Sequence, residues 1–144
     1  MHNFLFGIYP YIALAIGIMG SIARYERDPF TWKTSSSQLL RRKQLVIGSS
    51  LFHVGVLVIF VGHFVGLLTP IWVFDALGIG HGFKQVGAVV VGGIAGIMAL
   101  VGGGMLFHRR WTDPRIRNNS NFADIAILVL LLVQLILGLL TIFA

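Results

Sequence analysis

Four long apolar segments constrain the fold of this chain more than any other feature. They cover residues 4–23, 45–68, 86–107 and 123–144, and they contain no Asp, Glu, Lys or Arg apart from Asp124 at one end. A helix of about 20 apolar residues spans the hydrocarbon core of a bilayer. Only 11% of the residues are charged, whereas soluble domains carry about 25%. The sequence therefore predicts an all-α membrane protein, with four transmembrane helices forming one domain over residues 1–144.

The positions of the basic residues predict the orientation of these helices. The connection between the first two segments contains Arg24, Arg27, Lys33, Arg41, Arg42 and Lys43. The connection between the last two contains Arg109, Arg110, Arg115 and Arg117, whereas Lys84 is the basic residue of the connection between the second and third. Cytoplasmic loops are enriched in Lys and Arg. We therefore expect a multi-pass protein of the inner (cytoplasmic) membrane, with the N-terminus and Lys84 on the outer side.

The distribution of basic residues also disfavours nucleic-acid binding and a cleaved signal peptide. The net charge of +6 lies in the loops and is not spread over a soluble surface, so it does not indicate nucleic-acid binding. No Lys or Arg precedes the first apolar segment, and a cleaved signal peptide normally begins with such a basic region. We therefore expect the first segment to be retained as a transmembrane helix.

Two histidines, His53 and His63, lie inside the second apolar segment. Ten residues of helix rise about 15 Å, so the two rings would lie at two depths and on one broad side of the helix. An intramembrane histidine is a packing residue, a proton relay or a ligand. No acidic residue lies mid-membrane to form a relay, and zinc sites need three or four clustered ligands. Because neutral imidazole is a common axial ligand of haem iron, we interpret the pair as ligands of two haem groups.

The histidine count leaves each proposed haem with one ligand. His2 and His81 lie outside the apolar segments, and His108 lies at the cytoplasmic edge of the third. The chain contains no cysteine, which excludes thiolate ligation within it. The second ligands would then come from another chain or from a segment after Ala144. Because the sequence stops directly after an apolar run, we expect a truncated chain.

Small residues recur at helical spacing in the second and third apolar segments. The second contains Gly48, Gly55, Gly62 and Gly66, and the third contains Ala88, Gly92, Gly96, Ala99 and Gly103. Stripes of this kind let membrane helices approach closely. We expect packing at most of these positions, although room for a macrocycle beside the second helix is an open alternative for its glycines.

Charged and polar residues mark the ends of the apolar segments. Arg109 and Arg110 follow the third segment, where they favour a helix C-terminus and are also suited to pairing with buried carboxylates such as haem propionates. Asn121 is the expected N-cap of the fourth helix, with Asp124 in its first turn. Lys84 precedes the third segment, where a snorkelling anchor and a functional residue are both open interpretations.

Several longer motifs occur together along the chain. They include Ile8-Tyr9-Pro10-Tyr11-Ile12-Ala13, Thr31-Trp32, Ser36-Ser37-Gln38, Phe52-His53-Val54-Gly55, Ile59-Phe60-Val61-Gly62-His63-Phe64, Leu68-Thr69-Pro70, Trp72, Arg109-Arg110, Pro114-Arg115, Ala123-Asp124-Ile125 and Leu137-Gly138-Leu139-Leu140-Thr141. In these motifs the chain resembles the gamma subunit of respiratory nitrate reductase, the dihaem cytochrome b membrane anchor of that complex. The resemblance covers essentially the whole chain.

The resemblance implies specific roles for four residues. His53 would be an axial ligand of the cytoplasm-side haem b, and His63 of the outer-side haem b. Lys84 would contact quinol, and Arg110 would meet a propionate of the cytoplasm-side haem. The family has five transmembrane helices, and the fifth, which would supply the two partner ligands, is absent from this sequence.

The resemblance also implies a function. Quinol would be oxidised near the outer face, and electrons would pass to an iron–sulfur beta subunit and then to a molybdenum-containing alpha subunit that reduces nitrate to nitrite. The chain would hold no catalytic residue for nitrate itself. Two alternatives stay open: a related dihaem b anchor of a sulfite-type or heterodisulfide-type reductase, and a haem-free membrane scaffold or transporter subunit.

Overall fold

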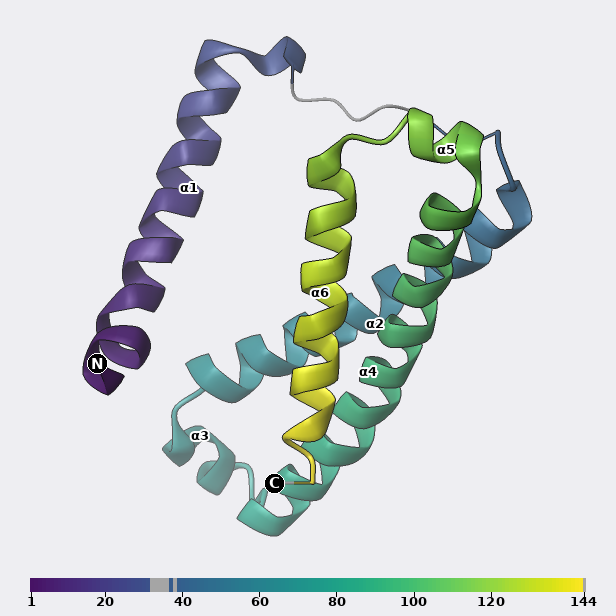
Figure 1. The fold of residues 1–144 in the computed structure, drawn as a ribbon. Helices are drawn as coiled ribbons and strands as arrows, with labels where there is room; N and C mark the ends of the chain where they lie inside the picture. The colour runs from purple at the N-terminus through teal and green to yellow at the C-terminus, as the bar shows by residue number, and fades with distance from the viewer. Residues whose placement is uncertain (32–36, 38, 144) are drawn as a thin grey trace. The chain divides into compact units, whose positions relative to one another are not determined.

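The computed structural model describes residues 1–31, 37 and 39–143. Trp32, Lys33 and parts of the Ser36-Ser37-Gln38 motif therefore lie outside the described residues. The regular elements of the described part are helical, in the order η1, α1, η2, α2, α3, α4, α5 and α6 (Figure 1). Four helical segments are long and apolar enough to cross a membrane. The prediction of an all-α membrane protein with four transmembrane helices is confirmed.

Among the described residues, 1–31 form one compact unit. Within it a π-helical turn, η1 (Phe4–Ile8), leads directly into α1 (Tyr9–Arg27), and a short 3₁₀ turn, η2 (Pro29–Thr31), follows. Pro10 lies in the first turn of α1, where the missing backbone N–H removes no helical hydrogen bond. Arg24 and Arg27 occupy the last turn, where positive charge stabilises the helix dipole.

Residues 36–144 form the second compact unit. Its three long helices are α2 (Arg42–Leu68), α4 (His81–Thr112) and α6 (Phe122–Leu140), and the short helices α3 (Ile71–Ala76) and α5 (Pro114–Asn118) connect them. Both α2 and α6 pack against α4 (Figure 1). The buried residues are concentrated on α4, which is therefore the central helix of this unit.

Small residues bring α2 and α4 into backbone contact. A Cβ atom placed on Gly55 would lie 2.6 Å from the carbonyl oxygen of Ala95 and 2.7 Å from the backbone nitrogen of Ala99. A Cβ atom on Gly102 would collide with the backbone nitrogen of Phe52 and lie 2.7 Å from the carbonyl oxygen of Gly48. A side chain at either position would force the two backbones apart. The packing role expected for Gly48 and Gly55 is thereby confirmed.

A second small-residue face of α4 receives α6. A Cβ atom on Gly96 would lie 2.7 Å from Leu139 Cδ2, and one on Gly103 would lie 2.9 Å from Leu132 Cδ2. Here leucine side chains fill the space above the glycines. By contrast, a Cβ atom on Gly62 or Gly66 of α2 would meet no described atom of a neighbouring element within 4 Å. The glycine stripe of α2 thus packs against α4 over only part of its length.

Most basic residues of the second unit lie at one end of it, whereas Lys84 lies at the other. Figure 1 shows α5 near the starts of α2 and α6, whereas α3 lies at the opposite end of α2. The sequence places Lys84 beside α3 and the arginines of residues 109–117 beside α5. At the start of α6, the side chain of Asn121 and the carboxylate of Asp124 form a reciprocal capping box. The predicted N-cap is therefore confirmed.

The backbone contacts of α4 predict unequal effects for two nearby glycines. Gly102→Ala forces a methyl group into the backbone of α2, whereas Gly104 has no such neighbour among the described atoms. We expect Gly102→Ala to lower the free energy of unfolding by about 1–3 kcal/mol, the usual cost of overpacking, and Gly104→Ala to leave it within about 0.5 kcal/mol. Unfolding in mixed detergent micelles measures both values. Equal stabilities would contradict the close α2–α4 contact.

Candidate functional site

His53 lies on an exposed part of α2 with its ring oriented by the helix itself. Its Nδ1 lies 2.7 Å from the carbonyl oxygen of Ser49, one turn earlier, and 3.1 Å from the Ser49 hydroxyl. A carbonyl oxygen only accepts hydrogen bonds, so this geometry assigns the proton to Nδ1. The Nε2 atom then carries the free lone pair.

His63 repeats this arrangement further along α2. Its Nδ1 lies 2.9 Å from the carbonyl oxygen of Ile59, again one turn earlier. The same argument places the proton on Nδ1 and the lone pair on Nε2. Because α2 is a continuous helix from Arg42 to Leu68, the two rings are separated by about 15 Å along its axis.

This donor set fits a haem iron. A metal-bound histidine usually donates its second ring N–H to a carbonyl or carboxylate, which fixes the tautomer and the ring orientation. Both histidines meet this requirement with backbone carbonyls. Their rings are also exposed on the surface of the unit, where a large planar ligand has access. Among the described residues no group of three or more His, Cys, Asp or Glu side chains is suited to holding a metal ion, so a compact site such as a structural zinc centre is not formed there.

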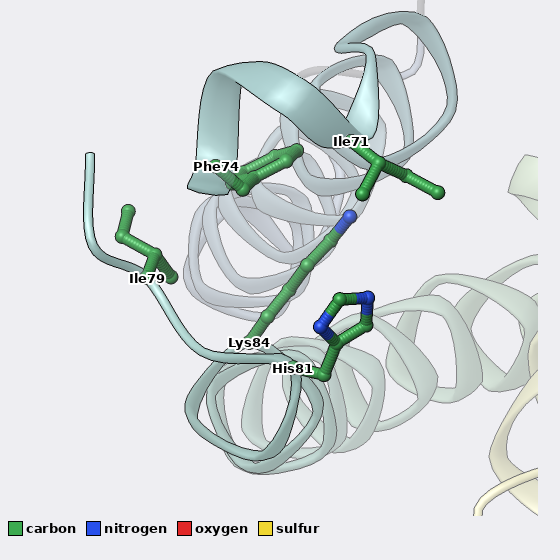
Figure 2. A pocket seen from close by; sticks show the side chains of 5 residues that line it. All are labelled: Ile71, Phe74, Ile79, His81 and Lys84. Carbon is green, nitrogen blue, oxygen red and sulfur yellow. The ribbon is translucent and has the colours of Figure 1, made fainter. Parts of the chain in front are cut away.

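Lys84 lies in a pocket at the end of the unit that contains α3. The pocket has a cavity volume of about 110 Å³ and is lined by Ile71, Phe74, Ile79, His81 and Lys84. Figure 2 shows Lys84 and His81 extending from α4 toward the side of the pocket formed by Phe74 and Ile71. The Lys84 ammonium nitrogen lies 3.9 Å from the centroid of the Phe74 ring. This cation–π contact holds the charge against an apolar wall.

Arg109 and Arg110 have different environments at the other end of α4. Arg109 is only 2% exposed, and it donates to the Ser37 hydroxyl at 3.2 Å, to the Leu40 carbonyl at 2.7 Å and to the Ser37 carbonyl. Arg110 is more accessible and lies 3.5 Å from Asp124 in the first turn of α6. Arg109 thus joins α4 to the segment before α2, and Arg110 joins α4 to α6.

Comparison with known proteins decides the family of the chain. Residues 2–144 match the family model described as the nitrate reductase gamma subunit. The chain belongs to the nitrate reductase gamma subunit family. This assignment confirms the resemblance drawn from the sequence motifs, and it favours this family over the anchors of other reductases. With its four candidate membrane spans, this gamma-subunit chain is a multi-pass membrane protein.

Curated relatives agree with the family match. The chain is 48% identical over 142 residues to the respiratory nitrate reductase 1 gamma chain of Escherichia coli (strain K12), covering 99% of this chain and 63% of the relative. It is 46% identical to the respiratory nitrate reductase 2 gamma chain of the same organism, with 99% and 62% coverage. The nitrate reductase gamma chain of Bacillus subtilis (strain 168) is 45% identical over 134 residues, with 93% and 60% coverage. The chain therefore spans about three fifths of the length of these gamma chains.

Two features of this gamma-subunit chain are not predicted by its sequence. The sequence pattern places Arg109 at a helix end or near a carboxylate, but its buried side chain binds backbone carbonyls across the chain. The same pattern identifies His81 only as a histidine outside the membrane, but it lines the same pocket as Lys84. The sequence signal for this pocket is the three-residue spacing of His81 and Lys84 near a helix start, since residues i and i+3 share a helix face.

The buried position of Arg109 predicts a change in protease sensitivity. Arg109→Met leaves the Ser37 and Leu40 carbonyls without their donor, at a cost of about 1–3 kcal/mol for each buried unsatisfied group. We expect trypsin to cut more rapidly after Arg41 and Arg42 in membrane vesicles of this variant. Arg117→Met is the matched control, because the described contact of the Arg117 side chain is with the Trp111 ring, 5.0 Å from its Cζ. Equal cleavage in wild type and Arg109→Met would contradict the role of Arg109 in joining α4 to the segment before α2.

Proposed function

We propose that this chain is the membrane-embedded dihaem b subunit of a quinol-dependent respiratory nitrate reductase. In this role it oxidises quinol near the outer face and passes electrons across the membrane. Its partners on the cytoplasmic side are an iron–sulfur beta subunit and a molybdenum-containing alpha subunit, which reduces nitrate to nitrite. The family assignment supports the complex, and the two oriented histidines of α2 support the cofactors.

The observation that carries the proposal is the backbone hydrogen bond that His53 and His63 share. Each ring donates its Nδ1 proton to the carbonyl oxygen one turn earlier, and each leaves Nε2 free on an exposed surface. A packing histidine needs no such repetition, whereas an axial ligand requires a fixed tautomer. A haem b with two axial histidines supplies a closed one-electron carrier. In this proposal His53 provides one axial ligand of the cytoplasm-side haem, and His63 provides one axial ligand of the outer-side haem.

The charge distribution supports the assignment of depths. The start of α2 lies beside the basic α5 end of the unit, and its last turn leads to α3 and Lys84 (Figure 1). If the basic end faces the cytoplasm, His53 lies in the cytoplasmic half of the membrane and His63 in the outer half. The second ligand of each haem would then come from a histidine-bearing helix outside these residues, in another chain or in the part of the gamma chains that this sequence does not match.

Arg110 is suited to the propionate of the cytoplasm-side haem. It lies at the same basic end as the first turns of α2, and a guanidinium carries five N–H donors. The contact with Asp124 uses one edge of the group, at Nη1. Bidentate pairing with a second carboxylate is the geometry that arginine favours. We propose this contact in addition to the ion pair with Asp124.

Lys84 supplies the polar contact for quinol in this proposal. Its ammonium group lies in the pocket at the α3 end, beside the Phe74 ring. The apolar side chains of Ile71, Phe74 and Ile79 would cover the faces of a quinol ring, and the ammonium would donate a hydrogen bond to one of its oxygens. A pocket with apolar walls and few polar groups is the usual form of such a site.

The proposed ligands predict separate losses of two redox centres. In the complete complex, we expect His53→Ala and His63→Ala each to remove one of two b-type midpoint potentials, because each variant removes one axial ligand. Reduced-minus-oxidised spectra in a redox titration measure both. His108→Ala is the control, since His108 lies outside the proposed ligand set and keeps both potentials. Loss of both or of neither potential in each variant, or a wild-type spectrum without b-type bands, would overturn the proposed haem ligation.

The proposed quinol contact predicts a loss of affinity in Lys84→Ala. A hydrogen bond to a charged donor contributes about 1.5–3 kcal/mol, so we expect the dissociation constant of a hydroxyquinoline N-oxide quinol analogue to rise about tenfold or more. Fluorescence titration of membrane vesicles measures this binding. Gln85→Ala is the matched control, because Gln85 is adjacent in sequence and does not line the pocket. Unchanged affinity in Lys84→Ala would exclude the contact.

A further inference from the structure

The pocket at the α3 end contains two polar side chains, and the proposed function uses only one of them. His81 and Lys84 are separated by three residues on α4, and both line the pocket. Figure 2 shows the imidazole beside the lysine stem, on the Ile71 side of the pocket. In the described part of the chain, no hydrogen bond or ion pair to another protein group occupies either side chain. Both are therefore available to a bound molecule.

The chemistry of quinol oxidation requires a group that Lys84 cannot supply. A quinol loses two protons when it becomes a quinone, and an ammonium group has three donors and no acceptor. The other lining residues, Ile71, Phe74 and Ile79, are apolar. A neutral imidazole has one nitrogen lone pair and takes up a proton in the physiological pH range. His81 is therefore the proton acceptor among the side chains that line the pocket.

We propose that His81 is the catalytic base that removes the first proton from quinol. In this step the O–H bond of one quinol hydroxyl breaks, its electron pair stays on the oxygen, and the proton forms an N–H bond on the imidazole. The products are a quinol monoanion and an imidazolium. Lys84 donates a hydrogen bond to the resulting anionic oxygen and stabilises its charge. This inference rests on the proposed quinol site and adds a proton acceptor to it.

The surrounding charges are consistent with transient protonation of His81. The charged side chains on α3 and on the first turns of α4, the elements around the pocket, are Asp75 and Lys84. Once the monoanion has formed, it lies between two cations and offsets their repulsion. Because His81 is exposed, its proton then has a direct route to the outer aqueous phase.

The test separates proton transfer from binding by means of His81→Gln in the complete complex. Glutamine keeps hydrogen-bonding capacity but cannot take up the proton. We expect kcat for quinol oxidation to fall about 100-fold or more, the usual contribution of a general base, while the dissociation constant of the hydroxyquinoline N-oxide changes less than about threefold. In wild type, kcat/KM falls with acidification as the imidazole becomes protonated, and this acidic limb is lost in the variant. His2→Gln is the control and retains wild-type behaviour, because the His2 ring contacts Phe6, with 4.7 Å between the ring centroids, and His2 does not line the pocket.

Each other outcome identifies which proposal fails. If Lys84→Ala loses analogue affinity while His81→Gln oxidises quinol at the wild-type rate with the acidic limb intact, the quinol site stands and the catalytic role of His81 is overturned. If His81→Gln weakens analogue binding as much as it lowers kcat/KM, His81 is a binding contact and not the base. If neither Lys84→Ala nor His81→Gln changes binding or turnover, the quinol site itself is elsewhere, and the inference falls with it.

Discussion

The backbone contact between α2 and α4 is the interaction on which the arrangement of the functional side chains depends. In a bilayer the surroundings are as apolar as the helix surfaces, so close van der Waals packing between small residues has to hold helices together. Gly55 and Gly102 provide that packing by bringing the two backbones into contact. The contact fixes the rotation of α2 about its axis. His53, which lies two residues or about 200° around the helix from Gly55, is thereby directed away from α4.

The contact between α2 and α4 covers only part of α2, so the two ends of the unit are held together differently. Near Gly48, Gln44 of α2 donates a hydrogen bond to the Met105 carbonyl of α4, and Arg109 of α4 donates to the Leu40 carbonyl just before α2. Toward Gly62 and Gly66, the described atoms leave the α2 surface uncovered. One end of the unit is consequently joined by polar links, and the other contains the pocket between α3 and the start of α4. The proposed outer-side haem ligand, His63, and the proposed quinol contact lie at the end where α2 and α4 are less tightly packed.

Much of this arrangement could be predicted from the sequence, because the membrane imposes simple rules. The four apolar segments, the capping box at Asn121 and the packing role of Gly55 follow from length, local hydrogen bonding and residue size. The division of α4 into two packing faces does not follow, because Ala95 and Gly102, which contact α2, fall outside the single stripe that the spacing indicates. Nor does the role of Arg109, since its partners are carbonyls distant in sequence, which any residue carries. The Nδ1 hydrogen bonds of His53 and His63 have no sequence pattern, because they depend on side-chain rotamers. The pocket around His81 has none either, because it depends on the path of the chain through α3.

The Nδ1 hydrogen bonds of His53 and His63 also bear on how such a protein is assembled. Each ring is oriented before any ligand arrives, so little rotational entropy remains to be lost on coordination. Each Nε2 is meanwhile an acceptor without a described partner in an apolar setting, and an unpaired polar atom there raises the free energy of the unliganded chain. Cofactor insertion would remove this penalty at two depths in one helix. In such a helix the unpaired Nε2 atoms favour cofactor binding after the helix has inserted into the bilayer. The more apolar the surroundings of these atoms are, the stronger this preference becomes.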